Sequence, residues 1–166
     1  LLPSALTVAS GFPQAGEPAY VVHAVRFASV PYRESNLVAG GDRTKSVDIA
    51  FTVWAVQGGG RNVLVDAGFY RDKFIQQWKP QNYVKPSEAL TTGLGLQPAD
   101  ITDIIVTHSH WDHMDGIDLF PKATIWIQRE EYEYYVGPDG TVAHSGGLDV
   151  ADAAMLFTLH AEGRVK

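Results

Sequence analysis

The sequence contains no cysteine among its 166 residues. Disulfide bonds, thiolate nucleophiles and cysteine-bound zinc or iron–sulfur sites are therefore excluded, and any bound metal ion must rest on histidine, aspartate or glutamate. Clusters of basic residues are missing as well. The chain has 13 Lys and Arg against 19 Asp and Glu, which gives a formal net charge of −6 at pH 7. An acidic chain without basic patches repels phosphate backbones, so we expect no nucleic-acid partner.

Long apolar runs are also absent, so we expect no membrane partner. The first residues, LLPSALTVASGF, carry neither a methionine nor a basic stretch. They fit either the remainder of a processed secretion signal or a simple start of the sequence, and cytoplasmic, periplasmic and secreted locations all stay open. The length of the chain suits one ordinary domain with a real core.

Segments rich in Val, Ile and Phe predict five strands, over residues 19–30, 46–57, 63–68, 103–107 and 121–128. A glycine turn at 58–62 joins the second and third of them into a hairpin, and 32–45 is expected to be a polar loop.

Three helices are expected, over residues 85–95, 129–135 and 148–163. Ser87 is predicted to cap the first, Asp149 lies near the cap of the third, and Gly163 follows its end. Because the strands occur both as hairpins and interleaved with helices, the fold class is mixed α/β (α+β), a layered domain.

The segment IIVTHSHWDHMDG, residues 104–116, holds three of the six histidines directly after an apolar strand. His108, His110 and Asp112 alternate, so in an extended chain their side chains point the same way, whereas His113 breaks the alternation and can face a second point. This spacing suits two cations about 3.5–4 Å apart, the first on His108 and His110 and the second on Asp112 and His113. A polar, hydrogen-bonded loop without metal is the alternative.

The pattern H-x-H-x-D-H resembles the signature of the metallo-β-lactamase-fold hydrolases. VLVDAGF, residues 63–69, is similar to the family's strand ending in Asp-Gly, which implies that Asp66 supports the metal ligands; the alternative is a turn residue capped by its own backbone. The stretch HSHWDHMDGIDLFPKATIWIQREEYEYY looks most like the branch of N-acyl homoserine lactonases. The resemblance runs from about residue 47 to 135.

The resemblance implies a sandwich of two β-sheets flanked by helices, and a hydrolase that opens a lactone or ester bond of a small molecule through a metal-bound hydroxide. Two divalent ions are expected, zinc before iron, manganese or cobalt, with Asp112 as a ligand and proton carrier. The alternatives are a β-lactamase, a glyoxalase II-like thioester hydrolase, a mononuclear iron dioxygenase using His108 and His110, or a binding module without activity.

Four ligands leave two metal ions short, because a catalytic zinc normally has three protein ligands and a water. The resemblance implies further ligands downstream, so residues 1–166 are expected to be the N-terminal part of one domain whose ligand-bearing C-terminal part is missing. That part, or a further copy of the chain, is the expected protein partner, and without it the chain could be inactive. His23 and His160 are expected to be packing residues, with His160 half-buried, and His144 could line a substrate pocket.

Other side chains near the turn receive weaker predictions. Met114, Asp115 and Gly116 stand where relatives often have a small residue and two glycines, and Asp115 is expected to face solvent. Phe69 and Tyr70 could form an apolar rim for an acyl chain.

Trp111 either walls the site or packs under the loop. Glu130, Glu131 and Glu133, in REEYEYY, are expected to face water rather than to form a catalytic pair.

Overall fold

The structure is a computed structural model that describes residues 6–8, 19–144 and 146–166. Most of the segment discussed as a remnant of a secretion signal lies outside these residues. Within the described part, no helix is both long enough and apolar enough to span a membrane.

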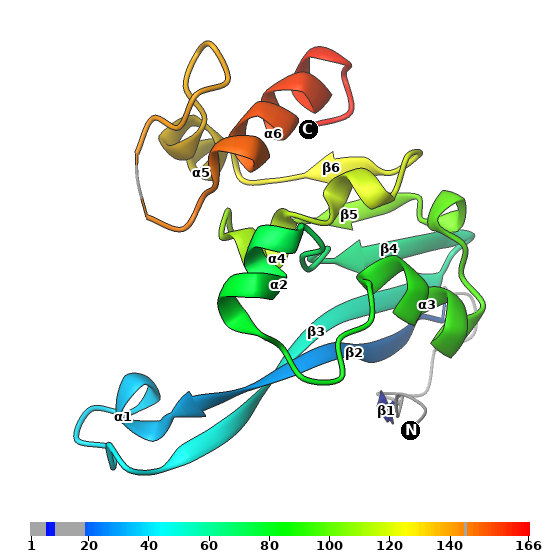
Figure 1. Cartoon of the computed structure of the whole chain (residues 1–166). Coiled ribbons are helices and arrows are strands. Elements are labelled where there is room, and N and C mark those ends of the chain that lie inside the picture. The colour runs from blue at the N-terminus through cyan, green and yellow to red at the C-terminus, as the bar shows by residue number, and fades with distance from the viewer. Residues whose placement is uncertain (1–5, 9–18, 145) are drawn as a thin grey trace.

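Six strands form one sheet in which spatial order follows chain order (Figure 1). The first four pair antiparallel, and the fourth to sixth pair parallel. The sheet confirms the mixed α/β class. The strands are β1 Leu6–Val8, β2 Val21–Arg33, β3 Ser46–Gly58, β4 Arg61–Val65, β5 Asp103–Ile105 and β6 Thr124–Trp126.

One face of the sheet is the core face. Ala55, Leu64, Ile104 and Ile125 are register partners from β3 to β6, and each is at most 1% exposed. In Figure 1, α2 and α3 lie in front of this sheet. The alternation of side chains along each strand therefore buries every second residue against the helices.

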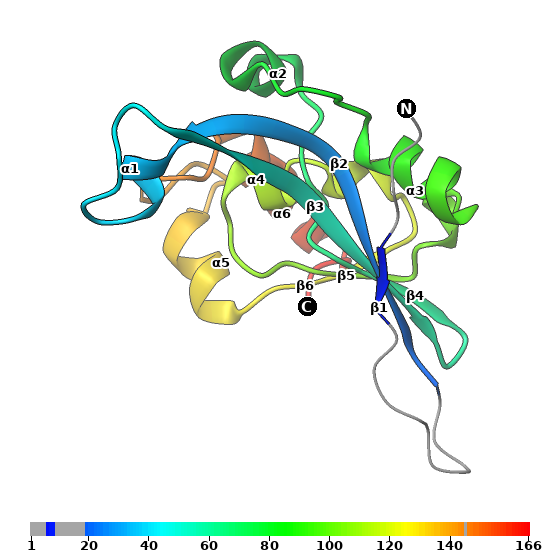
Figure 2. The same cartoon turned by 90° about the horizontal axis from the view of Figure 1, so that it is seen from below.

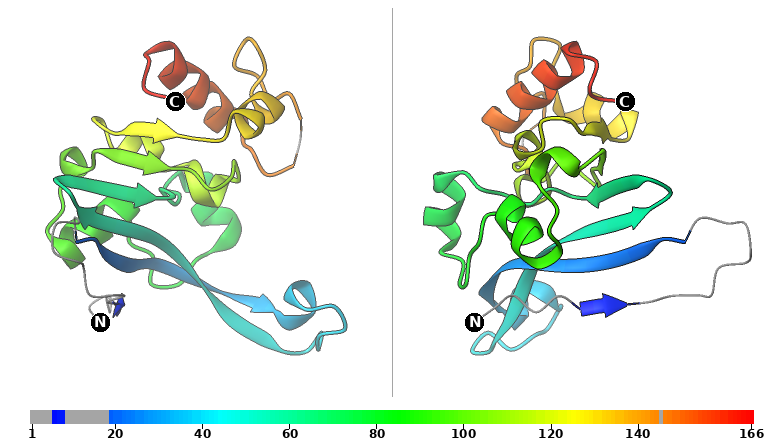
Figure 3. Two further views of the ribbon diagram at one scale, coloured as in Figure 1. Left: turned by 180° about the vertical axis from the view of Figure 1, so that it is seen from behind. Right: turned by 90° about the vertical axis from the view of Figure 1, so that its right-hand side faces the viewer.

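The neighbouring residues form a second row on the opposite face, which we call the outer row: Trp54, Val65, Ile105 and Trp126. Trp54, Ile105 and Trp126 are each 44% exposed. Seen from behind, β3 to β5 have no helix in front of them (Figure 3). The described chain thus leaves one apolar face of its sheet open.

The helices are α1 Glu34–Leu37, α2 Asp72–Trp78, α3 Pro86–Leu94, α4 Trp111–Met114, α5 Arg129–Tyr135 and α6 Val150–Ala161, with 3₁₀ turns at Pro98–Asp100 and Ile117–Leu119. The helix predicted over 129–135 is confirmed to the residue. Asp149 is the N-cap of α6 and accepts a hydrogen bond from Ala151 N, as expected.

Several predicted boundaries are wrong. Ser87 does not cap α3, because the cap position is Lys85 and Ser87 is buried inside the helix. The loop predicted over 32–45 contains the end of β2 and the whole of α1, and together with the start of β3 it forms an arm that extends beyond the sheet (Figure 2).

Candidate metal centre

The four predicted ligands lie in the turn after β5 and in the short helix α4 that follows it. After Ile105, the last residue of β5, the chain runs to His110, whose φ of −72° and ψ of 144° are extended. His108 and His110 therefore precede α4, whereas Asp112 and His113 lie in the helix. The backbone curls just where the spacing of these residues requires it.

The three imidazole rings lie together. The ring centroid of His108 is 4.5 Å from that of His110 and 4.0 Å from that of His113. Oδ2 of Asp112 lies 3.5 Å from Nε2 of His113. His110 is exposed and the others are half-buried, so the four side chains lie near one another on an accessible part of the surface. Their binding of metal stays a prediction.

Asp66 links β4 to this turn. It has a φ of 57°, in the left-handed region, so the chain leaves the strand there. Its carboxylate accepts hydrogen bonds from Thr107 N at 2.9 Å, Thr107 Oγ1 at 3.0 Å and His113 Nδ1 at 2.7 Å. The carboxylate thus bonds to the histidine turn and not to its own backbone. Because Nδ1 of His113 donates, the lone pair of the neutral ring lies on Nε2, the atom left for a metal.

Backbone contacts fix the distance between the two loops. Ala67 N donates to His113 O at 2.7 Å, and Gly116 N donates to Gly68 O at 2.9 Å. A Cβ on Gly116 would overlap the carbonyl oxygen of Ala67. Glycine at 116 is therefore required by the close approach of the two chain segments.

The histidines have different electrostatic surroundings. Burial disfavours the charged form of His113, but the hydrogen bond with Asp66 and the charges of Asp112 and Asp66 outweigh it and raise the pKa of His113. Burial, followed by the neighbouring His113 and His110, lowers the pKa of His108. His108 is consequently neutral at pH 7, which is the form that binds metal.

The donor set fits a divalent ion of the zinc or iron type. Oγ1 of Thr107 lies 3.0 Å from Nδ1 of His108, which leaves Nε2 of that ring available. Within residues 6–8, 19–144 and 146–166, no three or more His, Asp or Glu side chains are arranged around one common ion.

The prediction that Asp115 faces solvent is wrong. Asp115 is 0% exposed, and its carboxylate accepts from Tyr70 N at 2.7 Å, from Arg71 N at 3.1 Å and from the Arg71 guanidinium. Two backbone donors and an arginine compensate the buried charge. Asp115 therefore ties the metal-binding turn to the loop after Asp66.

Arg71 is a residue that the sequence did not single out. Its Nη1 also donates to Asp152 Oδ1 at 2.7 Å, and its Nη2 to Asp118 Oδ2 at 3.3 Å. Asp152, on α6, is 0% exposed. Burial and then the charge of Asp115 raise the pKa of Asp152, against the opposing effect of Arg71. These contacts join residues up to 81 positions apart, which no local pattern reveals.

The aromatic residues beside the turn belong to the core. Phe69 is 0% exposed, so it cannot form the rim of a substrate pocket as predicted. The Trp111 ring stacks on Phe74 with a centroid distance of 4.4 Å and contacts Phe69 edge-on at 5.0 Å. Trp111 thus packs under the loop, the second of its two interpretations. Tyr70 is half-buried, and its hydroxyl donates to Asp118.

The glutamates of α5 do not all face water. Glu130 and Glu133 are exposed, as expected. Glu131 is half-buried and accepts a hydrogen bond from Ser109 N at 2.7 Å. The prediction for Glu131 is therefore wrong, because its carboxylate contacts the backbone between His108 and His110.

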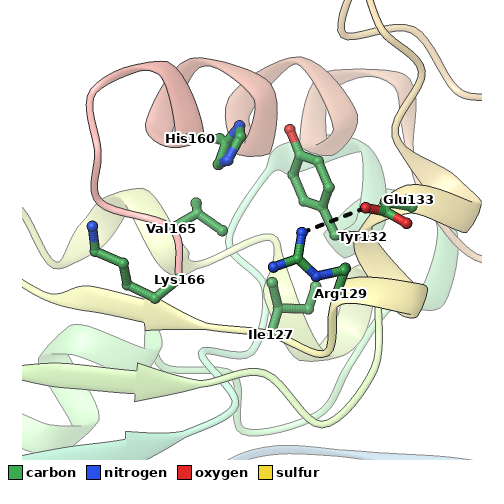
Figure 4. A pocket seen from close by; sticks show the side chains of 7 residues that line it. All are labelled: Ile127, Arg129, Tyr132, Glu133, His160, Val165 and Lys166. Atoms are coloured by element: carbon green, nitrogen blue, oxygen red, sulfur yellow. Dashed lines mark ion pairs between the residues drawn. The ribbon is translucent and has the colours of Figure 1, made fainter.

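The remaining histidines lie apart from the turn. His23 is half-buried in β2, and His144 stacks on the Tyr134 ring at 4.1 Å. His160 is exposed rather than half-buried, with its ring 5.1 Å from that of Tyr132. The rings of Tyr132 and His160 line a hollow of about 290 Å³ between α5, α6 and residues 165–166 (Figure 4). None of the four predicted ligands lines this hollow.

Comparison with known proteins adds sequence relatives. An N-acyl homoserine lactonase, AttM of Azorhizobium caulinodans, is 45% identical over 51 residues, 31% of this chain and 19% of that protein. A hydroxyacylglutathione hydrolase of Jannaschia sp. is 42% identical over 41 residues, 25% of this chain and 16% of that protein. The matched part thus spans less than a fifth of either relative.

A solved structure shares the fold. AidC, described as a dizinc quorum-quenching lactonase in complex with a product, superposes with a TM-score of 0.65 at 17% identity. The match covers 99% of this chain and 61% of that one. The profile of the Metallo-beta-lactamase superfamily matches residues 52–149, which are more than half of the chain and include Asp66 and the four predicted ligands. The chain belongs to the metallo-β-lactamase superfamily.

Proposed function

We propose that this chain carries the metal-binding turn of a metal-dependent hydrolase that opens lactone or ester bonds, with N-acyl homoserine lactones as the substrate class. One observation carries the proposal: three imidazoles and a carboxylate gather at one accessible turn, with Asp66 orienting His113 through a 2.7 Å hydrogen bond. The sequence similarity to a homoserine lactonase over 51 residues supports the substrate class.

In this proposal His108 and His110 hold one divalent ion, and Asp112 and His113 hold a second, with zinc as the expected metal. Such ions, when bound, supply an acidified water and a Lewis acid for the carbonyl oxygen. The side chains of this chain would orient the ligands and carry the proton. Asp66 would fix the tautomer of His113, and the half-buried carboxylate of Asp112 would serve as a ligand and as the proton acceptor.

The further ligands are proposed to come from outside residues 1–166, as part of the same domain. Two observations support this. The turn provides four donors for two ions, and the superposition on the dizinc lactonase covers 61% of that chain. The open outer row, described above, would then lie against the rest of the domain.

Hydrolysis assays on the longest available form of the protein test the proposal. We expect zinc-dependent opening of N-hexanoyl homoserine lactone that a chelator abolishes and zinc restores. Nitrocefin and S-lactoylglutathione, measured in parallel, represent a β-lactamase and the thioester hydrolase to which residues of this chain are 42% identical. Metal analysis separates two zincs from a single iron. Inertness of the zinc-loaded protein to the lactone would refute the assignment.

A further inference from the structure

The backbone between β5 and α4 is held by three separate segments. Thr107 N donates to Asp66 Oδ1, Ser109 N donates to Glu131 Oε1 at 2.7 Å, and Trp111 N donates to Gly147 O at 3.0 Å. These donors are alternate residues, and the ones between them are His108 and His110. In an extended segment, alternate N–H groups point to one side.

We propose that Glu131 is a positioning residue for the metal-binding turn, holding Ser109 so that His108 and His110 keep their relative orientation. This inference rests on the proposed function. Ser109 is 0% exposed, so removing the carboxylate would leave its N–H buried without a partner, which destabilises the closed turn and makes its local opening to water easier. A hydrogen bond to a carboxylate is stronger than one between neutral groups, and it fixes the backbone more firmly.

The position of Glu131 on its helix makes the contact specific. Arg129, Tyr132 and Glu133 of α5 line the hollow beside α6 (Figure 4). Glu133 pairs there with Arg129 at 3.8 Å, with 63% of its side chain exposed. Of the three glutamates of α5, Glu131 alone hydrogen-bonds to the turn in the described part of the chain. Glu130, its exposed neighbour, provides a matched control.

Metal affinity and amide exchange test the inference in the longest available form of the protein. We expect Glu131→Ala to weaken zinc binding, measured by competition with a chromophoric chelator, by about 10- to 100-fold, the usual loss when a group supporting a ligand is removed. Exchange of the Ser109 amide in the metal-free protein should accelerate at least about tenfold, as expected for a backbone donor that has lost its partner. Glu131→Gln keeps an oxygen acceptor without the charge, so its zinc affinity and its Ser109 exchange rate should lie between those of the native protein and of Glu131→Ala.

Glu130→Ala should leave both zinc affinity and Ser109 exchange unchanged. Near-UV circular dichroism of Glu131→Ala establishes that the fold persists, and Glu131→Gln serves if it does not. Unchanged exchange and zinc affinity in Glu131→Ala, or equal losses in Glu130→Ala, would overturn the inference. Because amide exchange needs neither substrate nor metal, it reports on Glu131 even if the protein hydrolyses no lactone.

Discussion

The buried carboxylate of Asp115 holds the loop after Asp66 in its conformation. It accepts from two backbone N–H groups and from Arg71, whereas Asp118 meets the same guanidinium from a partly exposed position. Removing one member of a buried ion pair leaves an uncompensated charge and costs about 3–5 kcal/mol. We therefore expect Asp115→Ala to lower the free energy of unfolding by that amount in urea titrations. Asp118→Ala, the control, should cost less than about 1 kcal/mol, and equal losses would contradict this account.

Asp152 is expected to make stability depend on pH. Its Oδ2 is buried and has no hydrogen-bond partner among the described residues, so the negative charge of the ionised carboxylate is poorly compensated there. Burial raises the pKa of Asp152 in the folded chain above its value in the unfolded chain. As pH rises above about 4, the unfolded chain releases this proton while the folded chain still holds it. Ionisation therefore favours the unfolded state, and the free energy of unfolding falls.

The expected result is a loss of stability for the native sequence as pH rises from about 4 towards 8, with a slope of up to about 1.4 kcal/mol per pH unit from this group. Asp152→Asn carries no ionisable carboxyl, so its advantage over the native sequence should grow across the same interval. Thermal melts of both proteins at several pH values measure the difference. Parallel pH profiles would show that Asp152 keeps an ordinary pKa.

The residues that could be predicted from the sequence are those whose partners lie nearby along the chain. The spacing of His108, His110 and His113 predicted a turn, and their rings lie together in the structure. Asp115 and Asp152 could not be interpreted, because Arg71 reaches them across 44 and 81 positions. Their burial depends on how α6 packs, which their own neighbourhoods do not encode.

At the level of elements, the loop before α6 packs on the metal-binding turn. A Cβ on Gly147 would overlap the imidazole of His110, whereas a Cβ on Gly146 would meet open space. Both glycines have positive φ, 124° at Gly146 and 112° at Gly147, so alanine is strained at either position. The two substitutions thus share their backbone cost and differ in the contact with His110.

We expect Gly147→Ala to displace the His110 ring and weaken zinc binding by at least about tenfold, in line with losses seen when ligand orientation is disturbed. Gly146→Ala should keep native zinc affinity, with a similar drop in melting temperature. Zinc titration and thermal melts of both variants provide the comparison. Equal zinc affinity in the two would mean that the ring does not need this packing.

Element types followed from the sequence more faithfully than element ends. α5 was predicted to the residue, whereas strands predicted to end at 68 and 107 end at Val65 and Ile105. Beyond Ile105 the residues Val106 and Thr107 are still β-branched, so local preference continues that strand. The chain instead turns at Asp66, whose carboxylate accepts a hydrogen bond from Thr107 N, an arrangement set by the site and not by strand preference.

On the scale of the whole molecule, the two faces of the sheet differ in how far their side chains are exposed. The residues facing α2 and α3 are buried, and the outer row exposes Trp54, Ile105 and Trp126 at 44% each. An exposed apolar row of this kind marks a contact surface. The shortage of metal ligands in the sequence predicted a missing C-terminal part, but it could not say which side chains that part would cover, because this depends on strand register.

A charge at Ile105 should distinguish an open face from a covered one. In the chain of residues 1–166, Ile105→Lys lies on the surface, so it should change stability by no more than about 0.5 kcal/mol and reduce binding of an apolar dye. In a longer form of the protein whose remaining segment packs on the outer row, the same lysine would be buried without a partner and should cost several kcal/mol. Val38→Lys, 57% exposed on the arm, is the control and should be neutral in both forms. If Ile105→Lys is equally harmless in both, the rest of the domain does not lie against this face of the sheet, and the further metal ligands must reach the histidine turn from another side.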